Sequence, residues 1–290
     1  MNTYALAPGH RACMGCGQAL GARLAITAAG QNVIVANATG CLEVFSTSYP
    51  DTAWRVAWIH SLFENAAAVA SGVEAALKAM GRTDTKVIAQ GGDGGTADIG
   101  LQALSGMLER GHDVLYICYD NEAYMNTGVQ RSSLTPFGAN TSTSPRGRIG
   151  WGNETRKKDL PAIAAAHHIP YVATASVGFY QDLQRKVKKA MSITGPKYLQ
   201  IHVPCPLGWA YASGETIKIA KLAVNCGLAP IYEMENGAVT GVHKISKKVP
   251  VVEYLQPQAR FRHLFQPGRE KELEEIQAIA DANIKRYGLM

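Results

Sequence analysis

A run of glycines interrupted by one acid, Gly91-Gly92-Asp93-Gly94-Gly95, most constrains the fold of this chain. It follows a short apolar segment, 86–90, with the pattern of a buried strand, and it precedes a helical pattern over about 97–110. Glycines at such a junction let the backbone approach phosphate oxygens, which free N–H groups at the start of the helix then bind. The sequence therefore predicts an α/β protein whose ligand site lies where a strand ends.

The same alternation of strand and helix recurs along most of the chain. The predicted strands are 31–36, 86–90, 113–119, 171–175 and 197–203. The predicted helices are 60–80, 97–110, 158–168, 181–192, one from about 215, and 270–287. This order predicts a mainly parallel sheet with helices on both faces. We expect one domain over 1–230 and then an irregular C-terminal arm, 231–290, whose charged helix packs on the domain or on a partner.

Composition excludes several classes of protein. Of the 290 residues, 47% are apolar and 18% charged, which argues against disorder and coiled coil. The sequence has no apolar run of the roughly 18 residues that a membrane span needs, and its start lacks the pattern of a signal peptide. We therefore expect a cytoplasmic protein with no membrane association. The net charge of +6 mildly favours acidic partners.

Asp93 indicates a metal ion. The glycine spacing does not fit the dinucleotide fingerprint G-x-G-x-x-G, and a carboxylate beside a phosphate is repulsive unless a cation lies between them. Asn121 follows the predicted strand 113–119, 28 residues after Asp93. If the two strands are parallel neighbours, Asp93 and the Asn121 amide oxygen can share one Mg²⁺ with a backbone carbonyl, waters and diphosphate oxygens. The alternative is a tight turn in which Asp93 only caps the helix.

Six cysteines in a cytoplasmic chain favour a metal or redox site over disulfides. Cys13 and Cys16 form a C-x-x-C on a glycine-rich turn, and two more cysteines follow predicted strands. We predict one four-cysteine centre made of Cys13, Cys16, Cys41 and Cys205. Cys118 and Cys226 are predicted to be structural. Four cysteinates suit zinc and a [4Fe–4S] cluster equally, and their spacing does not separate the two.

Two longer strings identify a family. GGDGGTADIG, and DNEAYMNTGVQRSSLTPFGA after it, resemble the β subunit of pyruvate:ferredoxin oxidoreductases and related 2-oxoacid:ferredoxin oxidoreductases. The resemblance extends over about 9–209, and its motifs are those of thiamine diphosphate enzymes. It implies the diphosphate-binding fold of those enzymes, and oxidative decarboxylation of pyruvate to acetyl-CoA and CO₂, with electrons passed to ferredoxin.

The resemblance also implies roles for single residues. Asp93, the Asn121 side chain and the Ala123 carbonyl would hold Mg²⁺, and Asn126 would hydrogen-bond the substrate carbonyl. The other residues implied to line the cofactor are Gln18, Cys41, Gly92, Gly94, Gly95, Glu122, Tyr124 and Met125. Gln18 departs from the family, which often has an acidic residue there. The four cysteines would hold the proximal [4Fe–4S] cluster, next to which an electron-rich thiamine adduct can give up electrons singly.

The chain lacks two parts that this chemistry needs. Thiamine activation requires a carboxylate at N1′ of the aminopyrimidine, and the local candidate, Glu64, is better explained as charge at a helix N-terminus. The sequence also has no ferredoxin-type C-x-x-C-x-x-C-x-x-x-C-P run. We therefore expect one subunit of a complex, with a pyrimidine-domain α subunit, a coenzyme A-binding γ subunit and a ferredoxin-like δ subunit.

Three other functions stay open. The same chemistry on another 2-oxoacid (branched-chain, aromatic or oxalate) is one, and a non-redox thiamine-dependent decarboxylase with a structural zinc site is another. The third is a zinc-stabilised scaffold with an empty diphosphate pocket. Basic clusters such as 156–158 and 185–189 are read as solvated faces, with docking of an acidic subunit or attraction of coenzyme A phosphates as alternatives. Nucleic-acid binding is disfavoured because no aromatic platform accompanies the charge.

Overall fold

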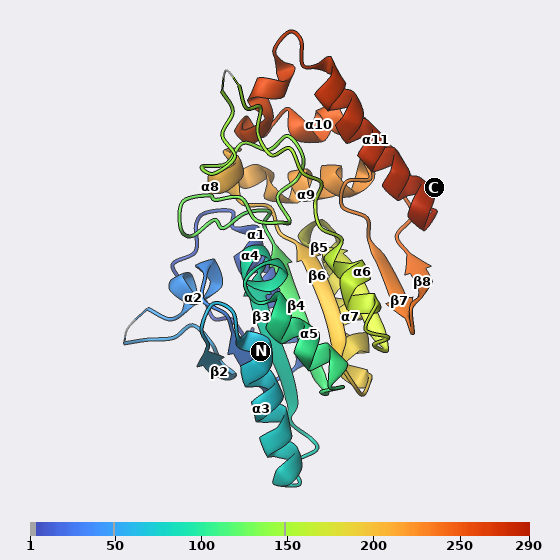
Figure 1. Ribbon diagram of the computed structural model, residues 1–290. Helices are drawn as coiled ribbons and strands as arrows, with labels where there is room; N and C mark the ends of the chain where they lie inside the picture. The colour runs from blue at the N-terminus through green and yellow to red at the C-terminus, as the bar shows by residue number, and fades with distance from the viewer. Residues whose placement is uncertain (1–3, 49, 148) are drawn as a thin grey trace.

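One eight-stranded sheet runs through the molecule in the order β2-β1-β3-β4-β6-β5-β7-β8 (Figure 1). The computed structural model describes residues 4–48, 50–147 and 149–290. Neighbouring strands from β2 to β5 are parallel, whereas the pairs β5–β7 and β7–β8 are antiparallel. The strands are β1 (Val33–Asn37), β2 (Ala57–His60), β3 (Lys86–Gly92), β4 (Val114–Asp120), β5 (Tyr171–Ser176), β6 (Lys197–His202), β7 (Tyr232–Glu235) and β8 (Ala238–Val242). The predicted α/β class with a mainly parallel sheet is confirmed.

Helices cover both faces of this sheet, as predicted. The α-helices are α1 (Gly17–Ala29), α2 (Cys41–Ser46), α3 (Ala66–Ala79), α4 (Asp93–Ala97), α5 (Leu101–Glu109), α6 (Leu160–Ala165), α7 (Tyr180–Ser192), α8 (Pro206–Trp209), α9 (Thr216–Asn225), α10 (Val251–Leu255) and α11 (Glu270–Tyr287). Short 3₁₀ helices are η1 (Val177–Phe179), η2 (Ser213–Glu215) and η3 (Ala259–Phe265). In the described part of the chain no helix is long and apolar enough to cross a membrane.

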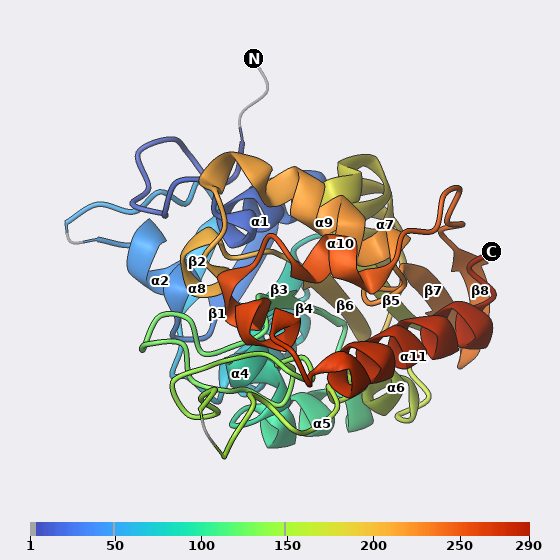
Figure 2. The same ribbon diagram turned by 90° about the horizontal axis from the view of Figure 1, so that it is seen from above.

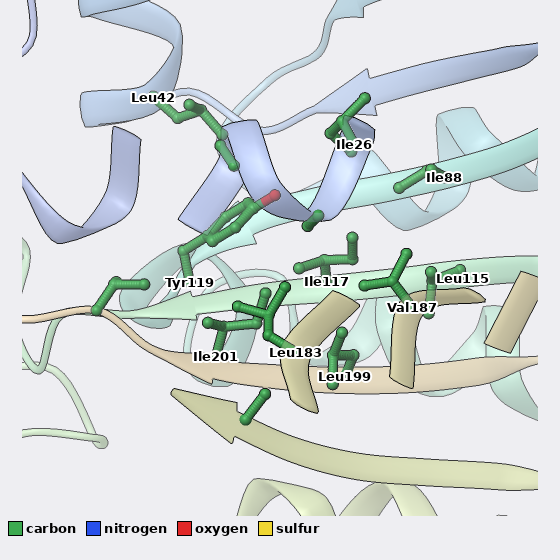
Figure 3. Close-up of a cluster of buried hydrophobic side chains, with 14 of the residues drawn as sticks. Ile26, Leu42, Ile88, Leu115, Ile117, Tyr119, Leu183, Val187, Leu199 and Ile201 are labelled. Atoms are coloured by element: carbon green, nitrogen blue, oxygen red, sulfur yellow. The ribbon is translucent and has the colours of Figure 1, made fainter. Parts of the chain in front are cut away.

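The central strand β4 is buried along its whole length, and its alternate side chains enter two different cores. Leu115, Ile117 and Tyr119 pack with residues of α1 and α7, among them Ile26 and Val187 (Figure 3). The intervening residues of β4 pack with α3, α5 and α6 on the opposite face. Burial on both faces explains why this strand reads as one continuous apolar run.

The predicted helix 60–80 begins later than expected. Residues Ala57–His60 form the edge strand β2, which pairs with β1, and α3 starts only at Ala66. Trp58 and Ile59 are aromatic and β-branched residues, which favour a strand over a helix. The predicted helix 97–110 is also divided in two. The short helix α4 begins earlier than predicted, at Asp93, and α5 begins after its N-cap residue Gly100.

The structure also differs from the expected irregular arm. Residues 232–242 form a hairpin, β7–β8, that continues the sheet beyond β5. Farther along, α10, η3 and α11 pack with α9 in a third apolar core. Seen from above, α10 and α11 lie across the end of the sheet formed by β5 and β6 (Figure 2). The arm therefore packs on the domain, at the end of the sheet where the parallel strands finish.

Candidate active site

Three oxygen atoms converge where β3 and β4 end. These strands are parallel neighbours, with Gly92 paired to Tyr119, so the residues that follow them meet at one edge. The side-chain oxygen of Asn121 lies 2.8 Å from Asp93 Oδ1 and 2.8 Å from the carbonyl oxygen of Ala123. We refer to residues 121–123 as the metal turn.

This cluster of oxygens fits Mg²⁺. An octahedral Mg²⁺ with bonds of 2.0–2.1 Å separates adjacent ligand oxygens by about 2.9 Å, close to the spacing found here. Reversing the Asn121 amide would turn both contacts into hydrogen bonds. In the orientation with three oxygens, the amide nitrogen instead donates to Gln18 Oε1 over a long 3.5 Å. A cation between the oxygens removes their repulsion without the reversal, and the donor set is the one that Mg²⁺ prefers.

The electrostatics of Asp93 support the same conclusion. Its side chain is buried, and its second carboxylate oxygen accepts a hydrogen bond from the Ser132 hydroxyl. Burial, and then the nearby Asp120 carboxylate, raise the pKa of Asp93 well above its ordinary value. An ionised Asp93 at this position therefore needs a positive partner, which a divalent cation would supply.

A pocket opens beside the metal turn and brings together most of the predicted cofactor residues. Those that line it are Gln18, Cys41, Gly92, Asp93, Gly94, Gly95, Asn121, Ala123, Tyr124, Met125 and Asn126. It is also lined by residues that the sequence analysis missed: Ala38, Thr39, Gly40, Leu42, Phe63, Gly91 and Thr127. A glycine-rich turn after β1, Thr39-Gly40, was a sequence signal for part of this second group.

Two glycines shape the pocket in different ways. A Cβ on Gly92 would meet no atom within 4 Å, so the backbone faces open space in which a diphosphate would fit. A Cβ on Gly94 would lie 2.3 Å from the Tyr124 ring, so only glycine allows that ring to pack there. Tyr124 stacks on Phe63 with ring centroids 5.8 Å apart and donates a hydrogen bond to Asp98 Oδ2 at 3.0 Å. The pocket thus has an aromatic wall beside its glycine-lined wall.

Three of the four predicted metal-centre cysteines lie at the starts of helices. Cys16 is the N-cap of α1 and accepts a hydrogen bond from the Ala19 amide, while Cys205 is the N-cap of α8 and accepts one from Gly208. Cys41 is the first residue of α2. A helix N-terminus stabilises negative charge and hence a thiolate. These three positions therefore suit the binding of a metal centre through ionised sulfur.

The four thiols also influence one another electrostatically. The pKa of Cys16 is raised to about 11, mainly by burial and to a smaller extent by the neighbouring thiols of Cys205 and Cys13. Burial raises the pKa of Cys41 to about 12, with additional contributions from Cys205, Cys16 and Cys13. Burial likewise raises the pKa of Cys205, and buried thiols with raised pKa values ionise readily only when a bound cation compensates their charge. Cys118 and Cys226 are fully buried in the apolar cores, as predicted.

The thiols do not form a single-ion site. Among residues 4–48, 50–147 and 149–290, no three His, Cys, Asp or Glu side chains are grouped closely enough to hold one metal ion. The three oxygens around Asp93 are not of that type, since Asn121 and the Ala123 carbonyl supply two of them. The thiols of Cys13, Cys16, Cys41 and Cys205 therefore do not converge on one point as the ligands of a single ion would.

Glu122 is the one predicted cofactor residue that does not line the pocket. Its side chain lies on the other side of the metal turn, against a second cavity of about 380 Å³ under α11. There it forms ion pairs with Arg260 at 2.6 Å and Lys157 at 2.9 Å. Burial opposes ionisation of Glu122, but Lys157, Arg260 and His202 lower its pKa to about 2. Lys157, expected on a solvated face, is thus a member of a mostly buried charge network.

Glu64 likewise lies outside the pocket, just before the Asn65 N-cap of α3. This position agrees with its interpretation as charge near a helix N-terminus. Among the described residues that line the pocket, the only carboxylate is Asp93. The pocket of this chain therefore offers anion and metal binding, and it offers no second acid as a proton acceptor.

Comparisons with known proteins identify the family of this chain. Residues 38–201 match the family described as thiamine pyrophosphate enzyme, C-terminal TPP binding domain. Pyruvate synthase subunit PorB of Methanosarcina barkeri is 58% identical over 289 residues, which cover 99% of this chain and 97% of that protein. Ketoisovalerate oxidoreductase subunit VorB of Pyrococcus abyssi is 46% identical over 263 residues, or 88% of this chain and 85% of that protein.

A solved structure shares the fold. It is a 2-oxoglutarate:ferredoxin oxidoreductase from Magnetococcus marinus, with 2-oxoglutarate, coenzyme A and succinyl-CoA bound. The matched chain is 22% identical, with a TM-score of 0.60, and the match covers 96% of this chain and 94% of that one. The parallel sheet and the edge at which its loops gather are therefore common to both proteins.

Proposed function

The chain belongs to the thiamine diphosphate-binding β subunits of 2-oxoacid:ferredoxin oxidoreductases, and on that premise we propose that it acts on pyruvate, with Mg²⁺ and a [4Fe–4S] cluster. The overall reaction converts pyruvate and coenzyme A to acetyl-CoA and CO₂, and its two electrons reduce ferredoxin one at a time. The observation that carries the proposal is the position of Cys41. This residue lines the pocket and is also electrostatically coupled to the other three cysteines.

The role of the pocket residues is to bind the cofactor and the substrate and to orient them. When bound, thiamine diphosphate supplies a nucleophilic carbon for the 2-oxo group and retains the electrons that remain after CO₂ leaves. Asp93, Asn121 and the Ala123 carbonyl would hold the Mg²⁺ that neutralises the diphosphate, and Gly92 would give that group room. Asn126, at the pocket wall, donates its amide hydrogen to the substrate carbonyl oxygen.

The cysteines hold the electron acceptor. Burial raises the pKa values of Cys16, Cys41 and Cys205, and the helix N-termini at these residues offset part of the cost of the thiolates that an iron–sulfur cluster requires. A single zinc ion holds its four sulfurs about 2.3 Å from one centre, and the four thiols do not converge in that way, which supports a cluster over zinc. Because Cys41 borders the pocket, a cluster held by these four cysteines would lie beside the cofactor and would supply a one-electron acceptor there.

Other subunits complete the enzyme. The pocket offers no carboxylate besides Asp93 among its described residues, so the carboxylate that activates the aminopyrimidine comes from the α subunit. Exposed apolar side chains close in sequence to Cys13, Cys205 and Phe63 support a covered surface there: Met14 is 80% exposed, Leu207 72% and Leu62 63%. A γ subunit that binds coenzyme A and a ferredoxin-like δ subunit supply the remaining functions.

A second substrate has a specific observation in its favour. The Pyrococcus abyssi relative, named a ketoisovalerate oxidoreductase subunit, is nearly as fully covered as the pyruvate synthase relative. The test is turnover of the assembled complex with pyruvate, 2-oxoisovalerate, an aromatic 2-oxoacid and 2-oxoglutarate, with a dye as electron acceptor. A highest kcat/KM for pyruvate supports the proposal. A preference for 2-oxoisovalerate would contradict the proposal and would indicate an enzyme that acts on branched-chain 2-oxoacids.

A further inference from the structure

Glu122 lies between two of the converging ligands and adopts an unusual backbone conformation. Its φ is +70°, in the left-handed region that residues with a side chain rarely occupy. In this conformation the Asn121 side chain and the Ala123 carbonyl face Asp93, while the Glu122 side chain extends to the opposite side. Such a conformation persists only when surrounding contacts hold it in place. The contacts of Glu122 therefore bear directly on the geometry of the metal turn.

The strongest of these contacts comes from the C-terminal arm. Arg260, in η3, donates to Glu122 Oε2 at 2.6 Å, although the two residues are 138 positions apart in the chain. The exposed fraction is 4% for the Arg260 side chain and 7% for that of Glu122. Lys157 donates to the other carboxylate oxygen at 2.9 Å. A buried, hydrogen-bonded pair of this kind tolerates little movement of either partner.

Arg260 also supports the turn through Trp209. The guanidinium carbon lies 3.7 Å from the centroid of the fully buried Trp209 ring. The indole nitrogen of Trp209 in turn donates to the Asn121 carbonyl oxygen at 2.8 Å. One arginine thus contacts the metal turn by two routes, through the Glu122 carboxylate and through the backbone of Asn121.

We propose that Glu122 and Arg260 are positioning residues, and that their ion pair makes the C-terminal arm a support for Mg²⁺–thiamine diphosphate binding. This inference rests on the Mg²⁺ site of the proposed function. Neither residue touches the metal or the cofactor. Together they hold Asn121 and Ala123 at the spacing at which their oxygens meet Asp93.

The test uses the assembled complex with bound thiamine diphosphate and measures the Mg²⁺ concentration at which half of the cofactor is retained. Glu122→Gln and Arg260→Gln each remove one charge of the pair, and both are expected to raise that concentration about 10- to 100-fold. Arg262→Gln is the matched control, because Arg262 is an exposed residue of the same helix. It is expected to leave the concentration within about twofold of wild type.

Melting temperature separates positioning from mere stability. An unchanged Mg²⁺ requirement with a lowered melting temperature would overturn the inference, since the pair would then only stabilise the fold. If a single variant does not fold, the double variant Glu122→Gln/Arg260→Gln, in which both charges of the pair are absent, decides the question. Tight Mg²⁺ binding in the folded double variant would also overturn it. A wild-type complex that needs no Mg²⁺ would instead refute the metal site itself.

Discussion

The amide nitrogen of Gly17 donates a hydrogen bond to the carbonyl oxygen of Pro204 at 3.1 Å. This bond joins the turn that carries Cys13 and Cys16 to the loop that carries Cys205. A Cβ on Gly17 would lie 2.6 Å from that same oxygen, closer than real contacts allow. The close approach of two backbones therefore holds the turn of Cys13 and Cys16 against the loop of Cys205.

Gly17→Ala is expected to separate these two segments. The clash is with backbone atoms, which cannot move aside cheaply, so the visible absorbance of the anaerobic complex should fall together with its iron content. Gly72→Ala is the control, because Gly72 lies within α3 and a Cβ there meets nothing within 4 Å. The control should keep its iron and gain up to about 1 kcal/mol of stability from higher helix propensity. Full iron in Gly17→Ala would contradict this account of the cysteine geometry.

Asp93→Asn is expected to weaken Mg²⁺-dependent thiamine diphosphate binding by more than about 100-fold, because a charged ligand contributes more than the outer residues that orient it. Asp98→Asn is the control. It removes a carboxylate that accepts a hydrogen bond from Tyr124 and is not one of the three converging oxygens. Cofactor retained after gel filtration at fixed Mg²⁺ measures both variants. Equal retention by the two would show that Asp93 is not a ligand.

Cys41→Ser is expected to abolish dye reduction while thiamine diphosphate stays bound, because Cys41 contributes only one wall of the pocket. Cys118→Ala is the comparison, since Cys118 is buried in the sheet away from the other thiols. It should cost about 1 kcal/mol of stability and keep electron transfer. Steady-state dye reduction and cofactor content are measured on the same samples. Normal dye reduction by Cys41→Ser would remove Cys41 from the set of cluster ligands.

Stability is expected to fall as the pH is lowered from 7 to 5, in part because of His202. Burial is the main reason that the pKa of His202 falls to about 4, against an ordinary value of 6.5. Between these values the unfolded chain binds a proton that the folded chain does not, so stability is complete above about pH 7 and decreases below it. At pH 5 this difference in protonation lowers the free energy of unfolding by roughly 2 kcal/mol. His202→Gln should show a correspondingly smaller loss between pH 7 and 5 in denaturant unfolding; an equal loss in both proteins would exclude His202 as a cause.

The sequence predicts best what depends on local pattern. Residues 113–119 were predicted as a buried strand because they form one apolar run, and β4 covers 114–120; Asp93 and Asn121 were paired because parallel strands finish at one edge. The hairpin at 232–242 was missed because β8 is mostly exposed and has no strong apolar alternation. Residues 17–29 were missed as a helix because their apolar stripe is weak and rich in alanine and glycine.

Contacts between distant segments could not be predicted. Phe63 enters the pocket only because it stacks on Tyr124, and nothing in the sequence between them signals this contact. Glu122 was predicted to line the cofactor because its neighbours, Asn121 and Ala123, are also predicted to lie there. Its left-handed backbone conformation turns the side chain away, toward an arginine 138 residues along the chain. Contacts between residues so far apart in the sequence form only when the whole chain is folded, so local sequence patterns do not predict them.

The iron content of the four-cysteine centre tests the central claim most directly. The wild-type complex and a Cys16→Ala/Cys205→Ala variant are purified anaerobically and analysed for iron and zinc per copy of this chain. We predict that the variant loses about four iron atoms and no zinc, as expected for one [4Fe–4S] cluster. Equal iron in the two complexes, or the loss of one zinc, would contradict the assignment of this chain as the subunit that passes electrons from the cofactor to the cluster.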